Sequence, residues 1–289
     1  MFAMTHGSPI RGVMICGAGH SGSTLLGLIL GRAKGAFYVG EGAKIRYLHD
    51  LKKPLRKRAC KICGEACPVW SDFHWDQDQP IYRQVAAHTG ASSIVDSTKN
   101  PAWIQARSDE LRAAGDQGAL IFLQRDGRAV LNSRFRKYPD RDAAEQVRSW
   151  MDQISASRAA YEGFDGPKII VRYEELATRP EVIVRKICSV ADLPYHPDML
   201  AFNEGESHPM GGNTGTQFVA ARDRVADDPD AILKLTPRTH DYYAKHSGDI
   251  RLDLRWKTEM SAPHLALFNE MAGEFNADMA WGEKRNDED

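Results

Sequence analysis

The sequence contains no long apolar run, no excess of either charge and no internal repeat. Its longest apolar-rich stretch, residues 25–30, is interrupted by Gly27 and falls far short of the roughly 18 residues that span a bilayer. Lys and Arg total 38 against 39 for Asp and Glu, whereas a nucleic-acid-binding surface usually brings a basic excess. We therefore expect no transmembrane segment and no nucleic-acid partner, and any bound anion must be held by a few placed cations.

Cysteine is also scarce, with five in 289 residues. An odd number in a chain too long to need stapling favours reduced thiols and a cytoplasmic protein. Residues 1–11 lack the charged-then-apolar pattern of a leader, and the charged residues 283–289 are expected to be a frayed tail. Since 42% of the residues are apolar, a sizeable core can form, and we expect a single domain over residues 1–289.

Short apolar runs alternate with helical patterns along the chain. Strands are predicted at residues 12–16, 92–95, 119–123 and 168–171, and helices at 23–32, from Pro101, near Ala129, from Asp142, at 180–191 and at 263–275. Buried strands separated by helices indicate an α/β fold of three layers, with a mostly parallel sheet flanked by helices. Residues 207–221 are rich in Gly, Asn and Thr and are predicted to be a loop that folds back over the ligand edge of the sheet.

A glycine-rich segment, GAGHSGST at residues 17–24, joins the first predicted strand to the first predicted helix. Glycines let successive backbone N–H groups and the helix N-terminus point at an anion. The segment nearly matches G-x-x-x-x-G-K-[ST], but a serine stands at the lysine position, so we expect a nucleotide with less charge there than a triphosphate. The alternative is a turn without a ligand. The predicted nucleotide-binding residues of this segment are Gly19, His20, Ser21, Gly22, Ser23 and Thr24.

The run from His20 to Thr24, between a strand and a helix, resembles the first motif of the sulfotransferases that use 3′-phosphoadenosine 5′-phosphosulfate. A later strand ends in Arg125, with Ser133 eight residues on, which is similar to their second motif and implies a site for the 3′-phosphate. An arginine at a strand end is physically suited to this task because it offers a fixed bidentate cation. His20 departs from the pattern, since the family usually carries Lys or Arg there.

The likeness covers about residues 13–256 and is closest to bacterial members and to those acting on carbohydrates or protein tyrosines. It implies a sulfotransferase fold like that of the P-loop NTPases and a transferase that moves a sulfuryl group to a hydroxyl of a sugar, lipid, peptide or small molecule. Tyr173 and Glu174 are interpreted as structural, and Arg128 and Arg134 as surface or secondary contacts. Thr214–Gln217 stands where the family often has an arginine. The oligomeric state stays open.

Sulfuryl transfer needs a stabilised leaving group and a base for the acceptor hydroxyl. Lys99, just after a strand, is the candidate for the leaving group. Glu41 is the candidate base, because family members with a carboxylate base carry a Glu at this point, and we expect burial to raise its pKa. His20, also counted among the catalytic candidates, and His208 are rival bases.

Three thiols, those of Cys60, Cys63 and Cys67, have the spacing of half a zinc knuckle, for which His74 or His49 could supply a fourth ligand. A second Cys-x-x-Cys is absent, so reduced structural thiols are favoured and no metal is assigned. The other two cysteines, at positions 16 and 188, lie in apolar patterns and are expected to be inert core residues.

Two other functions stay open at this point. A P-loop kinase or nucleotidase would need ATP and Mg²⁺, and a silent nucleotide-binding protein would bind without transfer. The pair of Arg125 and Ser133 favours the sulfotransferase, because a 3′-phosphate needs a dedicated site that ATP does not. The donor is then 3′-phosphoadenosine 5′-phosphosulfate, and no metal is expected for transfer.

Overall fold

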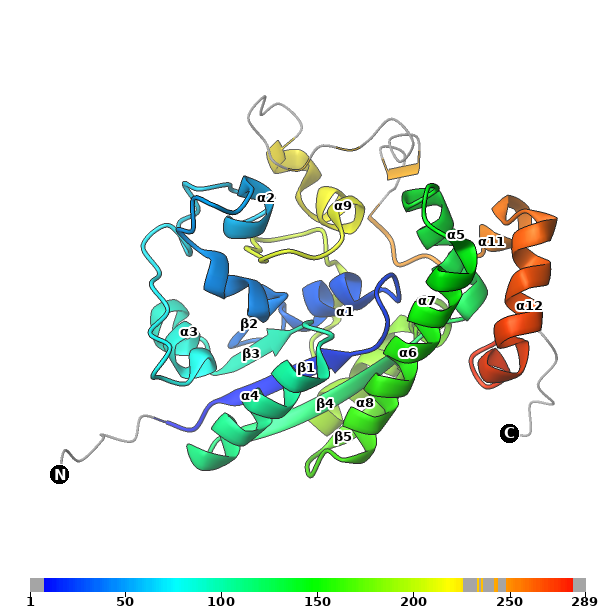
Figure 1. Cartoon of the computed structure of the whole chain (residues 1–289). Helices are drawn as coiled ribbons and strands as arrows, with labels where there is room; N and C mark the ends of the chain where they lie inside the picture. The colour runs from blue at the N-terminus through cyan, green and yellow to red at the C-terminus, as the bar shows by residue number, and fades with distance from the viewer. Residues whose placement is uncertain (1–7, 226–232, 234, 236–241, 244–247, 283–289) are drawn as a thin grey trace.

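A computed structural model describes residues 8–225, 233, 235, 242–243 and 248–282 (Figure 1). Five strands form one sheet in the order β2-β3-β1-β4-β5, and every neighbouring pair is parallel. The sheet confirms the predicted fold class. The strands are β1 (Arg11–Cys16), β2 (Ala36–Gly40), β3 (Ser93–Asp96), β4 (Gln117–Gln124) and β5 (Lys168–Arg172).

Helices connect and cover the strands. They are α1 (Ser23–Leu30), η1 (Gly42–Tyr47), α2 (Leu55–Arg58), α3 (Ile81–Thr89), α4 (Pro101–Ala113), α5 (Gly127–Lys137), α6 (Ala143–Glu162), α7 (Tyr173–Thr178), α8 (Pro180–Ala191), η2 (Pro197–Leu200), α9 (Thr214–Val225), α11 (Trp256–Glu259) and α12 (Ala262–Asn276). Among the residues described, no helix is long and apolar enough to cross a membrane.

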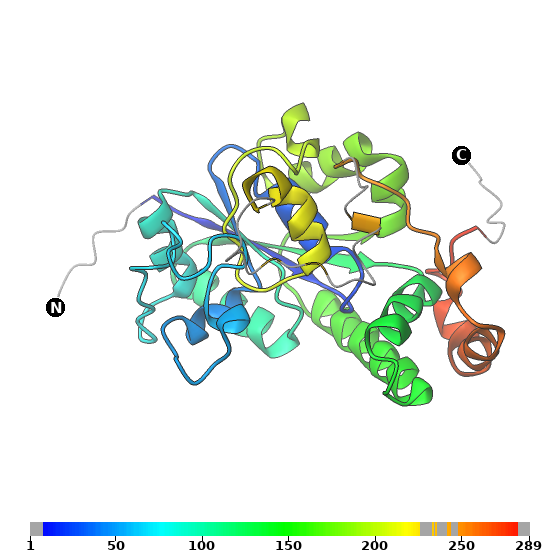
Figure 2. The same cartoon turned by 90° about the horizontal axis from the view of Figure 1, so that it is seen from above.

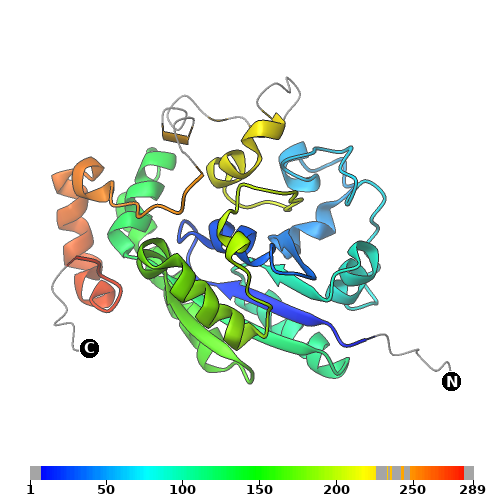
Figure 3. The same cartoon turned by 180° about the vertical axis from the view of Figure 1, so that it is seen from behind.

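The two faces of the sheet carry separate hydrophobic clusters because successive strand side chains point in opposite directions. Met14 of β1 joins the cluster that contains residues of α3, α4 and α6, whereas Val13 and Ile15 join the cluster of α1 and α8. Figure 3 shows the second face, with α8 in front of the strands. Helices on both faces of one sheet give the three predicted layers.

Side-chain caps explain why several helices begin where the sequence predicted. Asn100 Oδ1 accepts a hydrogen bond from Trp103 N at 3.1 Å, and Pro101 follows as the first residue of α4. Asp142 Oδ1 accepts from Glu145 N at 2.7 Å and starts the long helix α6. Each cap satisfies a backbone N–H that has no partner within its own helix.

Several elements differ from the prediction, among them the helices α3 and α7, which were not predicted from the sequence. Strand β2 was not predicted. The loop predicted for residues 207–221 is wrong in its second half, where α9 begins, because Asn213 Oδ1 accepts from Thr216 N at 2.9 Å and Val219 is buried. Figure 2 shows α9 lying across α1, which it contacts. The first half does cross the ligand edge, since Met210 N donates to Val39 O at 2.8 Å. The tail at 283–289 lies outside the described residues.

Candidate active site

The candidate site lies at the carboxyl edge of the sheet, where the strand order reverses around β1. Parallel strands end at one edge, and ligands of open α/β sheets bind at such a reversal. The loops after β2, β3 and β4 therefore bring Glu41, Lys99 and Arg125 together. Nine of the ten predicted site residues line one cavity: Gly19, His20, Gly22, Ser23, Thr24, Glu41, Lys99, Arg125 and Ser133. The tenth, Ser21, is buried in the same loop.

The glycine-rich loop forms the floor of this cavity. Gly22 precedes α1 with φ 93°, a left-handed conformation that favours glycine, and a Cβ there would lie 2.6 Å from Cδ2 of Tyr173. The first amides of α1 have no partner within the helix, and the helix dipole favours an anion at this end. The loop is therefore shaped to receive a phosphate group.

Arg125 connects the loop to helix α5. Its guanidinium donates to His20 O at 3.1 Å and lies 4.1 Å from the ring centre of Tyr173. His20 Nδ1 in turn lies 2.9 Å from Ser133 Oγ. The Nε atom of Arg125 is buried and has no hydrogen-bond partner among the described residues. The predicted pair of Arg125 and Ser133 is thus connected through His20, and the Nε donor of Arg125 has no acceptor among the described residues.

Sequence reasoning missed Asp253, which fixes the orientation of Arg125. The two side chains form an ion pair at 3.2 Å, and Asp253 also binds Arg255 through both oxygens at 2.8 Å. Burial opposes ionisation of Asp253, but these arginines outweigh it and lower the pKa of the carboxyl group.

Tyr173, predicted to be structural, also lines the cavity. Glu174 is structural, since its carboxylate accepts from Asp126 N at 3.0 Å.

His20 is neutral in this arrangement. Burial, together with the nearby cations Lys137, Arg134, Arg125 and Lys99, lowers the pKa of His20 to about 3. It therefore supplies neither the positive charge that its position usually carries nor an effective base near neutral pH. Lys137, which sequence reasoning missed, lines the same cavity. Its position four residues after Ser133 on one helical face could have pointed to it.

Glu41 and Lys99 form an ion pair beside the glycine-rich loop. Lys99 Nζ lies 3.3 Å from Glu41 Oε1 and 3.3 Å from Ser23 Oγ, and it donates to Ser97 O at 2.8 Å. Glu41 Oε2 lies 2.5 Å from Lys44 Nζ. Burial raises the pKa of Glu41, but the two ammonium groups outweigh burial and the net shift is downward. The prediction of a raised pKa for Glu41 is therefore wrong.

A buried carboxylate at the end of β3 holds both members of this pair in place. Asp96 accepts hydrogen bonds from Gly42 N at 3.0 Å and from Thr98 N at 2.7 Å, the neighbours of Glu41 and Lys99. Tyr82 and Trp103 donate to its other oxygen at 2.8 Å each. Four donors occupy the carboxylate, so Asp96 positions the pair and is not free to bind a cation.

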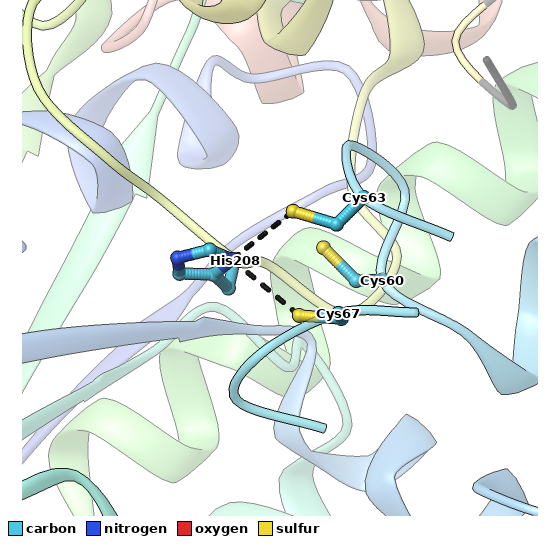
Figure 4. A group of neighbouring side chains, drawn as sticks. All are labelled: Cys60, Cys63, Cys67 and His208. Carbon is cyan, nitrogen blue, oxygen red and sulfur yellow. Dashed lines mark hydrogen bonds between the residues drawn. The ribbon is translucent and has the colours of Figure 1, made fainter. Parts of the chain in front are cut away.

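Arg128 and Arg134 were interpreted as surface or secondary contacts. Both are buried, so the surface alternative is wrong, and Arg134 makes a secondary contact because it donates to Gly19 O of the loop. His208 does not line the cavity, so it is not placed to act as the base. It lies instead against Cys63 and Cys67 (Figure 4).

The predicted fourth partners of the cysteines, His49 and His74, do not join them. Their rings stack on each other at 4.5 Å, and His49 Nε2 lies 2.9 Å from Phe73 O. Cys16 and Cys188 are buried core residues as predicted, and burial raises their pKa values to about 12 and about 11.

A second cavity adjoins the first and shares Glu41 and His20 with it. Its other charged lining residues are all cations: Lys44, Arg56, Lys57, Lys61, Arg136, Lys137 and Arg255. Burial, together with the neighbouring charge of Lys44, lowers the pKa of Lys61 to about 8. A molecule that enters this cavity therefore meets Glu41 in a positive field.

Comparison with known proteins identifies the family. A family profile described as sulfotransferase family matches residues 12–197. The chain belongs to the sulfotransferase family. Its fold is that of the sulfotransferase domain from the curacin biosynthetic pathway, with a TM-score of 0.52 at 16% identity over 92% of this chain and 99% of that one. No curated protein matches the chain in sequence.

Two further sulfotransferases resemble the chain in structure. The domain from the Synechococcus PCC 7002 olefin synthase aligns with a TM-score of 0.48 at 17% identity, over 93% of this chain and 97% of that one. Mouse SULT7A1, solved in complex with PAP, aligns with a TM-score of 0.48 at 11% identity, over 94% and 89%.

This sulfotransferase replaces the usual arginine after Gly212 and Asn213 with the start of α9. Thr216 lines the cavity, whereas Gln217 is buried and its amide donates to Gly211 O. Cations reach the cavity from a different segment, through Arg251 and Arg255. The charge on this side of the site therefore comes from residues that the local motif does not contain.

Proposed function

We propose that this sulfotransferase moves a sulfuryl group from 3′-phosphoadenosine 5′-phosphosulfate to an acceptor hydroxyl by in-line transfer. The observation that carries the proposal is the junction of Arg125, His20 and Ser133 at the end of the glycine-rich loop. A buried guanidinium with an unsatisfied Nε suits a second phosphate beside the one on the loop. A donor with phosphates at both positions meets this need, whereas ATP has no 3′-phosphate.

The residues of the site divide by the part of the donor that they would bind. The amides and hydroxyls of residues 19–24 would hold the 5′-phosphosulfate, and Arg125 with Ser133 would hold the 3′-phosphate. Lys137 would supply the charge that neutral His20 lacks. Lys99, already beside Ser23, would stabilise the phosphate oxygen that leaves.

The reaction needs one proton acceptor on the acceptor side. The sulfur–oxygen bond to the 5′-phosphate breaks, a bond forms from sulfur to the acceptor oxygen, and the hydroxyl proton passes to Glu41. Glu41 lines both cavities, so an acceptor in the second cavity and a donor in the first would meet beside it. The products are the sulfated acceptor and adenosine 3′,5′-bisphosphate.

The site gives no support to a magnesium-dependent kinase. Each acidic side chain that lines the first cavity in the described part of the chain pairs with a cation: Glu41 with Lys44 and Lys99, Asp249 with Arg251, and Asp253 with Arg125 and Arg255. Asp96, the carboxylate at the end of β3, is fully occupied by protein donors. These carboxylates thus orient the arginine and lysine side chains of the site, which is a different role from binding Mg²⁺.

A thermal-shift titration tests the proposal with adenosine 3′,5′-bisphosphate, 5′-AMP and ATP. We expect the bisphosphate to bind best. A charge-assisted hydrogen bond contributes about 1.5–3 kcal/mol, so Arg125→Ala should weaken its binding at least about tenfold and leave 5′-AMP nearly unchanged. Arg148→Ala, at an exposed position on α6, is the control. Equal affinity of the wild type for bisphosphate and 5′-AMP would exclude the 3′-phosphate site.

A further inference from the structure

Outside the candidate active site, three cysteines and one histidine converge from segments far apart in the sequence (Figure 4). Cys60, Cys63 and Cys67 lie on the loop that follows α2, and His208 precedes α9. Their ligand atoms all lie within 4.8 Å of one another. His208 Nδ1 is 3.2 Å from Cys63 Sγ and 3.4 Å from Cys67 Sγ.

These distances suit one tetrahedral metal ion. Zn–S bonds of about 2.3 Å and a Zn–N bond of about 2.0 Å place the ligand atoms of a tetrahedron roughly 3.5–3.8 Å apart. The four side chains are near this spacing already, so small side-chain rotations would complete the geometry. Three thiolates with one imidazole form a soft donor set, which selects zinc over magnesium or calcium.

The backbone is built to present these ligands. Gly64 adopts φ 72°, and its N–H donates to Cys60 O at 3.0 Å, so the chain reverses directly after Cys63. Trp70 Nε1 donates to the backbone oxygen of His208 at 2.6 Å and holds that residue against the cysteine loop. Two thiols with two residues between them and a restrained histidine are the parts of a preformed site.

A second layer of contacts supports the histidine as a ligand. His208 Nε2, the ring nitrogen turned away from the thiols, lies 3.7 Å from Glu206 Oε2. Zinc-binding histidines usually direct their other ring nitrogen to a carboxylate or carbonyl, which orients the ring. Cys60 and Cys67 have no exposed surface, and His208 is 7% exposed. Cys63 is half-buried, and a full set of four protein ligands leaves no position for a substrate.

We propose that Cys60, Cys63, Cys67 and His208 bind one Zn²⁺ ion in a closed, structural site. The ion joins the cysteine loop to the segment at residues 208–213. It takes no part in sulfuryl transfer, because none of its four ligands lines either cavity.

The zinc site would act as a clamp on one wall of the active site. Glu41 N donates to Met210 O at 2.6 Å, and Asn213 N donates to Thr24 Oγ1 at 2.9 Å. Lys61, inside the cysteine loop, donates to Gly212 O at 2.9 Å. The segment at 208–213 thus touches the candidate base, the glycine-rich loop and the cysteine loop at once.

Metal analysis of the purified full chain tests the site directly. We expect one zinc per chain. Cys63→Ser removes one ligand at a half-buried position and should weaken zinc binding at least about a hundredfold, since losing even an outer-layer partner costs 10–100-fold. Cys188→Ala and His74→Ala are the matched controls, because both residues lie outside the cluster, and they should keep a full equivalent of zinc.

Cobalt substitution makes the test independent of how well a variant folds. Reduced, metal-free wild-type protein given Co²⁺ should develop the strong d–d bands of a tetrahedral ion and a thiolate-to-cobalt charge-transfer band. Failure to bind either zinc or Co²⁺, or a disulfide among the three cysteines in protein purified without reductant, would overturn the site. An unchanged unfolding temperature after zinc removal would overturn the structural role.

Discussion

Replacing Glu41 by glutamine tests the assignment of the base most sharply. The substitution keeps the size and polarity of the side chain and removes its basicity. General-base catalysis contributes typically 10²–10⁴-fold, so kcat should fall by about that factor. Glu41 also neutralises Lys99 at 3.3 Å, a pair whose gross attraction is about 5 kcal/mol at an effective dielectric constant of 20. Desolvation offsets much of this attraction, but the remaining interaction of Glu41 with Lys99 is attractive.

Freeing Lys99 from Glu41 should favour the anionic nucleotide. We therefore expect Glu41→Gln to bind adenosine 3′,5′-bisphosphate as tightly as the wild type, or more tightly, while its kcat collapses. A structural collapse of the site would instead weaken nucleotide binding together with turnover. Initial-rate kinetics and calorimetric titration of the bisphosphate separate the two outcomes. Glu181→Gln, an exposed surface carboxylate on α8, is the control.

The pH dependence of turnover gives a second test of Glu41 as the base. The pKa of Glu41 is depressed in the free protein, so its ionised, basic form persists to lower pH than that of an ordinary glutamate. A bound donor would attract Lys99 and bring negative charge near Glu41, which raises its pKa in the complex. The acid limb of kcat should therefore lie at higher pH than the acid limb of kcat/KM. A Glu41→Gln enzyme with wild-type kcat across the pH range would refute the assignment.

Three other predictions follow from the same contacts. Lys99→Ala should lower kcat by about 10²–10³ with a smaller loss of bisphosphate affinity, because the charge it stabilises grows as the sulfur–oxygen bond breaks. An unchanged kcat would refute the leaving-group role of Lys99. Transfer measured within minutes of adding EDTA should persist without stimulation by Mg²⁺, whereas loss restored by Mg²⁺ would favour a kinase. Asp96→Asn should destabilise the protein by about 1–3 kcal/mol in urea unfolding, because an amide cannot accept from all four donors, and an unchanged midpoint would contradict the positioning role.

The parts of the site that the sequence predicted are those whose geometry is local. The glycine-rich loop joins a strand to the next helix, and Ser133 follows Arg125 by eight residues along one strand–helix unit. In both segments, the position of the functional side chains depends only on where one strand ends and on the turn that follows it. Topology then brings the strand ends to one edge, as a parallel sheet requires. The fold class could therefore be predicted from the alternation of strands and helices alone.

Charge interactions across the site could not be predicted in this way. Burial alone would raise the pKa of Glu41, and the sequence offers no sign that Lys44 and Lys99 both reach its carboxylate. The neutrality of His20 likewise depends on burial and on cations from α5 and from the loops after β3 and β4, which local spacing does not place around its ring. Which charged groups pair depends on distances in the folded structure, and the direction of each pKa shift depends on that pairing.

The cysteine cluster shows the same limit and links the two sites. Spacing identified three ligands, but the histidine that completes them lies 141 residues beyond Cys67, and two nearer histidines were more obvious candidates. The segment that carries His208 also donates Asn213 N to Thr24 of the glycine-rich loop. A metal clamp there would act on the wall of the nucleotide cavity and not on the reacting atoms. Loss of zinc should thus weaken bisphosphate binding and raise the KM for the donor. The acid limb of the pH–rate profile, which Glu41 sets, should stay at the same pH. A catalytic metal could not produce this pattern.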